Sequence, residues 1–195
     1  MDNASDDYMY QLSSLIQMFE FHLGNKNLPE ADVKFKEIFE LSNNDVDIGI
    51  MLCYLYNQYG FNNQAIIKLD YIYDNSDEKE EILFEKSLLL QESDLQESIR
   101  ICKGLLFNDI DDEFKSKVYV NLGNFYSKIN TNLSFDYYLK AINSNSNNLV
   151  ALKNLAVHHA NEGDYFFAEG YVDNGLKIEK CDYDLLFLKA NLCRD

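Results

Sequence analysis

The sequence predicts an all-α protein built from stacked helical hairpins, and three observations support this prediction. Its 195 residues include one proline and eight glycines, too few for the many tight turns of an all-β chain. Hydrophobic residues make up 47% of the chain, with 13 Phe and 14 Tyr, so a substantial core can be buried. One helical pattern also recurs at intervals of 33 to 36 residues, and a period of this size is typical of helical-repeat arrays.

The pattern is clearest over residues 116–148. Its predicted first helix carries Tyr119, Leu122, Gly123 and Tyr126, and its second carries Ser134, Tyr138 and Ala141. This copy resembles the tetratricopeptide repeat (TPR), whose first helix follows the pattern W-x2-L-G-x2-Y, with Tyr here in place of Trp.

The other copies, in chain order, place similar residues at the same sites. A degenerate first copy over 12–45 has Leu15, Phe19, Ala31 and Phe35, and the second, over 46–79, has Leu52, Cys53, Tyr56 and Ala65. The third, over 80–115, is weaker and has Leu83, Ser87, Ser98 and Cys102, while the fifth, over 149–182, has Leu155, Ala156, Gly163, Ala168 and Gly175. The small-residue site of the first helix falls at positions 19, 53, 87, 123, 156 and 190, so the copies keep one period.

The TPR resemblance implies a right-handed α-solenoid of about five helical hairpins within a single domain, 1–195. One hairpin cannot bury its apolar face alone, so neighbouring hairpins share a continuous core. Ala156, Ala168 and Gly175 are expected where helices cross closely, and Gly163 is expected to end a first helix. Residues 183–195 are expected to form a capping helix that shields the last repeat. The proline that usually ends a TPR is replaced by Asn43, Asp77, Ser146 and Lys180.

Charge is distributed unevenly along the chain, whose formal net charge is −16. Residues 1–115 hold 24 acidic and 9 basic residues, whereas residues 116–195 hold 9 and 8. A negative field repels nucleic acid and anionic membrane surfaces, so neither is expected as a partner, and it attracts basic proteins. The excess of acid also has a simpler reading, in which it only keeps the protein dispersed.

The compartment predicted from the sequence is the cytoplasm. The amino terminus is acidic where a secretory signal would be basic, and no apolar run is long enough to span a membrane. The four cysteines are Cys53, Cys102, Cys181 and Cys193, and their spacing supports neither a disulfide framework nor a zinc site.

No catalytic, metal or cofactor site is expected. His158 and His159 are neighbours that point about 100° apart on a helix, so they cannot bind one metal together, and His159 falls at an aromatic packing site. The acidic segment 108–114 lacks the glycine and final glutamate of a calcium loop. No nucleophile motif or phosphate-binding glycine loop is present, so the chain is expected not to be an enzyme.

The resemblance places the first helices along a concave groove that binds a partner protein. The groove residues expected from the repeat register are Tyr54, Asn57, Gln58, Phe84, Leu88, Gln91, Asn121, Asn124, Lys153, Asn154 and Val157. An asparagine amide both donates and accepts, as a peptide unit does, although these asparagines can also bond between helices. A second expected contact is an acidic surface made of Asp109, Asp111, Asp112 and Glu113.

Three hypotheses for the function stay open at this point. The first is an adaptor or chaperone that holds an extended segment in the groove. The second is an immunity or antagonist protein that covers a basic toxin or nuclease with its acidic surface. The third is a structural subunit that self-associates through exposed aromatic residues. Some TPR proteins grip a C-terminal carboxylate with Lys, Arg and Asn side chains, but Ile16, Glu20, Ile50 and Tyr54 occupy those sites here.

Overall fold

A computed structural model describes residues 3–192, with side chains from Asp6 onward, and this part of the chain forms eleven α-helices and no β-strand. In chain order the helices are α1 (Asn3–Gly24), α2 (Leu28–Leu41), α3 (Val46–Gln58), α4 (Asn62–Asp74), α5 (Lys79–Leu90), α6 (Leu95–Leu105), α7 (Asp112–Ser127), α8 (Thr131–Ser144), α9 (Leu149–Asn161), α10 (Tyr165–Ile178) and α11 (Tyr183–Leu192). The all-α prediction is therefore confirmed.

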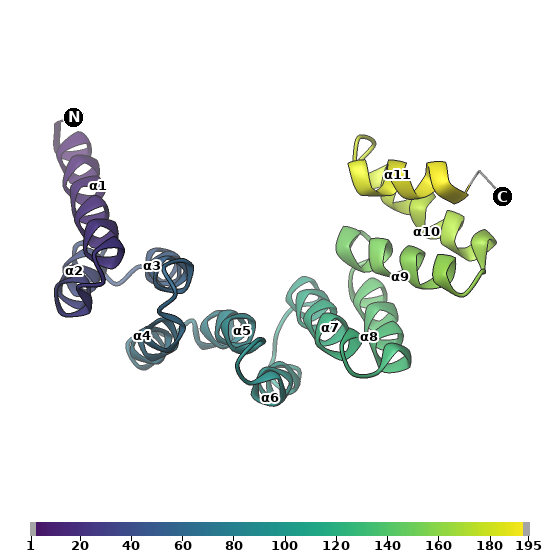
Figure 1. Cartoon of the computed structure of the whole chain (residues 1–195), viewed down its shortest axis with the longest axis horizontal. Helices are drawn as coiled ribbons and strands as arrows, with labels where there is room; N and C mark the ends of the chain where they lie inside the picture. Colours follow the sequence, from purple (N-terminus) through teal and green to yellow (C-terminus); the bar gives the residue numbers. More distant parts are fainter. Residues whose placement is uncertain (1–2, 193–195) are drawn as a thin grey trace. The chain divides into compact units, whose positions relative to one another are not determined.

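Four of the five expected hairpins form packed helix pairs: α1 packs on α2, α3 on α4, α7 on α8, and α9 on α10 (Figure 1). The chain divides into two compact units, residues 1–93 and 94–195, with α5 in the first and α6 in the second. Helix α1 begins at Asn3, well before the expected start of the first repeat near residue 12. The organisation as one domain over residues 1–195 stays a prediction.

The core of the first unit is aromatic. Phe19 and Tyr56 meet edge to face, with ring centroids 5.0 Å apart, and the ring of Phe35 lies 6.1 Å from Tyr56. All three side chains are fully buried. Phe19 occupies the site that is small in later repeats, so here an aromatic ring fills the space between the helices.

In the second unit, close helix crossings depend on small residues. A Cβ atom added at Gly123 would lie 2.4 Å from the ring of Tyr138, and one added at Gly175 would lie 2.4 Å from Leu185. The approach of α8 to α7 also lets the Ser134 hydroxyl donate to the carbonyl of Gly123 at 2.8 Å. Ala156 and Ala168 are fully buried. The expected crossing points are therefore confirmed.

The helix ends follow from local chemistry. Gly60 and Gly163 have φ angles of +84° and +81° just after α3 and α9, where a residue with a side chain would be strained. Asn43, which stands near the place of the usual proline, has a φ of +61°, a conformation that asparagine tolerates. Six helices follow an aspartate or asparagine whose side chain accepts a backbone N–H, namely α3, α6, α7, α8, α9 and α11.

Helix α11 covers the last hairpin with only one of its faces. Leu185 is fully buried against the gap left by Gly175, as expected of a cap. However, Tyr183, Leu186 and Phe187 are 77%, 46% and 60% exposed. The other side of α11 is thus apolar and open, whereas a cap normally turns a polar face outward. Residues 193–195 of the expected cap lie outside the described residues.

Candidate functional site

A groove of about 460 Å³ runs between α9 and α11, the first helices at the carboxyl-terminal end of the second unit. Its apolar part is formed by Val150 and Val157 of α9 and by Leu185, Phe187 and Leu188 of α11. Val150, Val157 and Phe187 are 50%, 47% and 60% exposed. Apolar side chains from two neighbouring helices thus face one solvent-accessible hollow, which is the usual composition of a ligand site.

Polar groups of the groove are largely held by one another. The Lys153 ammonium lies 2.6 Å from Asp182 and 2.9 Å from Asp184, at the beginning of α11. The hydrogen bond to Asp182, followed by that to Asp184, raises the pKa of Lys153. The bond from Lys153 also lowers the pKa of Asp182. This end of the groove therefore carries two carboxylates and one ammonium group, and its net charge is negative.

Asn154 lies beside Lys153 in the groove but turns its Nδ2 group back to the carbonyl of Val150, at 2.9 Å. This bond lies within α9, so the side chain is fixed by its own helix. Lys153, Asn154 and Val157 are the three expected site residues that the groove brings together.

Six groove residues were missed by the sequence analysis: Val150, Asp184, Leu185, Phe187, Leu188 and Asn191. Five of them belong to α11, which was interpreted only as a cap. The signal that could have found them is the small-residue site at Ala190. Extending the repeat register to this site places Phe187 in α11 where Lys153 lies in α9.

The two expected asparagines of α7 have a different environment. The Oδ1 of Asn124 accepts a hydrogen bond from the Tyr138 hydroxyl at 2.8 Å, so it ties α7 to α8. Asn121 is buried, and its Nδ2 has no hydrogen-bond partner. Neither residue lines the groove between α9 and α11. Contact of Asn121 or Asn124 with a partner stays a prediction.

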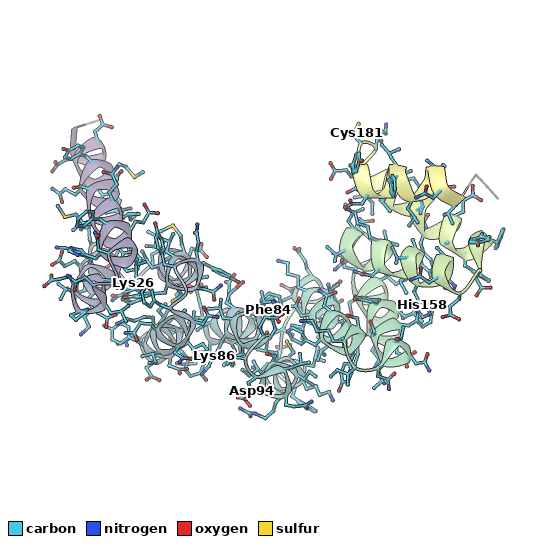
Figure 2. All side chains as sticks on the ribbon, in the orientation of Figure 1. Lys26, Phe84, Lys86, Asp94, His158 and Cys181 are labelled. Carbon is cyan, nitrogen blue, oxygen red and sulfur yellow. The ribbon has the colours of Figure 1, made fainter. Side chains whose placement is uncertain are left out.

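In the first unit, α3 and α5 are neighbouring first helices, and the expected residues lie along them. The Tyr54 hydroxyl donates to the carboxylate of Glu85, and burial followed by this bond raises the pKa of Tyr54. The other expected residues have varied exposure: Gln58 is exposed, whereas Asn57, Phe84, Leu88 and Gln91 are half-buried. Figure 2 labels Phe84 on α5.

Comparison with known proteins is informative at the level of structure. No protein-family model matches the sequence, and no curated protein matches it. PilF of Pseudomonas aeruginosa is similar over 96% of this chain and 85% of its own, with a TM-score of 0.67 and 17% identity. A tetratricopeptide repeat protein from Parabacteroides merdae is similar over 93% and 72%, with a TM-score of 0.60 and 16% identity.

YrrB, described as a TPR protein with an unusual peptide-binding site, is similar over 90% of both chains, with a TM-score of 0.56 and 11% identity. At sequence identities this low, the similarity to these solved structures shows a shared fold. The chain has the TPR fold. In this TPR array the groove lies between α9, the first helix of the last hairpin, and α11, the helix that follows that hairpin.

The expected acidic surface of this TPR chain lies before and within the start of α7. Asp111 is the N-cap of α7 and accepts the backbone N–H of Phe114 at 2.7 Å, so it has a structural role. Asp109, Asp112 and Glu113 are exposed. Asp112 and Glu113 lie 3.7 and 3.5 Å from lysines of the same helix, separations at which exposed pairs interact weakly. Contact of this surface with a partner stays a prediction.

The two histidines of the TPR chain pack among aromatic rings. His158, labelled on α9 in Figure 2, stacks on Phe135 with ring centroids 4.5 Å apart. His159 stacks on Phe167 at 5.3 Å and on Tyr171 at 5.6 Å. The packing role predicted for His159 is therefore confirmed. Within residues 3–192, no group of three or more His, Cys, Asp or Glu side chains is arranged to hold a metal ion.

Proposed function

We propose that this TPR protein is a non-catalytic interaction module that holds an extended segment of a partner protein in the groove between α9 and α11. The observation that carries the proposal is the set of exposed apolar side chains on two adjacent first helices, Val150, Val157 and Phe187. Contiguous exposed apolar surface of this kind is typical of an interaction site.

The groove also limits the chemistry of the segment. Its apolar part suits an aliphatic or aromatic side chain of the partner. Because Asp182 and Asp184 neutralise Lys153 and leave an excess negative charge, we do not expect a segment that ends in acidic residues. A neutral or basic segment with one apolar anchor fits the groove best.

Two substitutions test the groove directly. We expect Val157→Asp and Phe187→Asp each to weaken binding of a peptide selected from a random library by about 30-fold, because anchor residues of an interface contribute about 2 kcal/mol or more. Both positions are exposed, so the far-UV circular dichroism spectrum is expected to stay unchanged. Isothermal titration calorimetry measures the affinity.

The matched control is Phe107→Asp, because Phe107 is 91% exposed and does not line the groove. The Phe107→Asp protein is expected to bind the selected peptide with the affinity of the wild type. Equal loss in all three variants, or no loss in the groove variants, would contradict the proposal.

The antagonist function is the second candidate, and the acidic excess of residues 1–115 favours it. In that case a basic partner would associate rapidly at low salt and more slowly as ionic strength rises. We expect replacement of Asp109, Asp112 and Glu113 by lysine to slow association at least about tenfold at low salt. Asp111 is left intact because it caps α7. Stopped-flow or surface plasmon resonance kinetics measure the rate.

The control for charge reversal replaces three exposed acids of the second, nearly balanced half, Asp136, Glu162 and Glu179, by lysine. If this control slows association as much as the first set, net charge alone governs encounter and the acidic surface near α7 is not a specific contact. Self-association is the third candidate, and sedimentation equilibrium distinguishes it from the other two.

The cytoplasmic location stays a prediction as well. No helix in the described range, 3–192, combines the length and apolar character needed to cross a bilayer.

A further inference from the structure

Gly170 lies in the middle of α10, where no neighbouring atom is close enough to require a glycine. A Cβ atom added at Gly170 meets nothing within 4 Å, whereas one added at Gly123 or Gly175 would collide with a neighbouring helix. Glycine inside an exposed helix costs about 1 kcal/mol relative to alanine. Packing in the second unit therefore does not explain this residue.

A hollow of about 340 Å³ lies on the surface of α10, and Gly170 is one of the residues that line it. Phe166 and Phe167 lie one turn before Gly170, and Asp173 and Asn174 lie one turn after it. Residues three and four positions apart share one face of a helix. The floor of the hollow is thus the helix itself, and these side chains form its two ends.

Two exposed aromatic rings form the first end. Phe166 is 83% exposed and Phe167 is 56% exposed, and their rings meet edge to face with centroids 5.6 Å apart. The ring of Phe167 is held in place by stacking on His159 of α9. The aromatic end is therefore a preorganised surface on which a planar or cationic group can stack.

The two ends of the hollow differ in charge. Asp173 pairs with Lys189 of α11 at 2.6 Å, and Asn174 accepts a bond from Lys177 at 3.0 Å. Cations of the chain itself therefore occupy the second end. Glu169 also lines the hollow and is exposed. A partner group that enters between the phenylalanines and Glu169 meets aromatic faces and a carboxylate.

We propose that this hollow binds an arginine side chain of a partner protein. A guanidinium group is planar, stacks on aromatic rings and donates two parallel hydrogen bonds to a carboxylate such as Glu169. The aliphatic stem of the arginine would pack over the open backbone at Gly170. The hollow shares no residue with the groove between α9 and α11, so it is a second contact surface that does not depend on that groove.

The test uses two short probes and the full chain. The first probe is an acetylated, amidated Gly-Gly-Arg-Gly-Gly peptide, and the second has citrulline, which is neutral and nearly isosteric, in place of arginine. In titrations of ¹⁵N-labelled protein, the arginine peptide is expected to shift the amide resonances of residues 166–174 saturably. We expect the citrulline peptide to bind about tenfold more weakly, since it lacks the charge that both contacts require.

Gly170→Leu tests the shape of the hollow. The substitution fills it with a residue that favours helix, so binding of the arginine peptide is expected to weaken about tenfold while the thermal midpoint stays equal or rises. Gly104→Leu is the matched control, because a Cβ atom at Gly104 also meets nothing within 4 Å, and it is expected to bind as the wild type does. Glu169→Gln is expected to weaken binding about threefold.

Three results would overturn the proposal. One is the absence of saturable shifts in residues 166–174, and another is equal binding of the arginine and citrulline peptides. The third is a set of shifts in these residues that appears on raising the protein concentration alone, because a second copy of the chain would then cover the hollow.

Discussion

Gly123→Leu is expected to lower the free energy of unfolding of residues 94–195 by about 3 kcal/mol, at the upper end of the usual cost of overpacking. The physical reason is the approach of α8, because a Cβ atom at this position would lie 2.4 Å from the Tyr138 ring. A ring is rigid and cannot yield as the end of a flexible side chain can. Moving it would also break the bond from the Tyr138 hydroxyl to Asn124.

Urea denaturation followed by far-UV circular dichroism measures this loss. Gly170→Leu is the control with the same chemical change in another helix of the same unit, where a Cβ atom has open space, and its stability is expected to be equal or higher. If Gly123→Leu unfolds at the wild-type urea concentration, the crossing of α7 and α8 is not as close as the structure has it.

The second large effect is expected at Asp32, in the first unit. Its carboxylate lies 2.9 Å from the buried ammonium of Lys68 and accepts bonds from Tyr56 at 2.6 Å and from Gln64. Asp32→Asn keeps a hydrogen-bond acceptor but leaves Lys68 without its charge partner. Since the carboxylate is partly exposed, we expect a loss of about 1–3 kcal/mol, between the values for surface and buried pairs.

The pH dependence of this loss identifies its cause. Burial acts to raise the pKa of Asp32, but hydrogen bonds from Tyr56, Lys68 and Gln64 outweigh it and hold the pKa below the usual value of 3.8. A depressed pKa stabilises the fold above the pKa of the unfolded chain, and this contribution is lost as the pH falls through the folded pKa. The stability difference between wild type and Asp32→Asn should therefore be constant above about pH 5 and shrink below about pH 4.

Urea denaturation of both proteins from pH 7 to pH 3 measures this difference. Asp70→Asn is the control, because its pair with Lys86 has a carboxylate side chain that is 55% exposed, and a much smaller loss is expected. A difference that stays constant down to pH 3 would show that Asp32 acts through its shape rather than its charge.

The fold was largely predictable because its signals are local and repeated. The small residues at 123, 156, 168 and 175 could be placed at crossings from one period, and the structure buries each of them. Helix ends were also predictable at Gly163, where the φ angle requires glycine. The extent of α1 before residue 12 was not predictable, because the repeat pattern gives no signal for a helix that begins before the first repeat.

The site was less predictable because it depends on pairings that the register does not specify. Lys153 lies on the expected face of α9, but no periodicity shows that Asp182 and Asp184 hold its ammonium. The register also gives no sign that the Oδ1 of Asn124 accepts a bond from the Tyr138 hydroxyl. The open face of α11 was missed because a final helix was assumed to have only a covering role.

Site-specific photocrosslinking tests the central claim, that the groove between α9 and α11 holds the partner. Benzoylphenylalanine would replace Val157 or Phe187 in the groove, and Phe107 or Ile129 as exposed apolar controls, in the cells that produce the protein. The proposal predicts that one and the same protein is crosslinked from positions 157 and 187 and not from 107 or 129. Crosslinks from 107 or 129 together with none from 157 and 187 would contradict it.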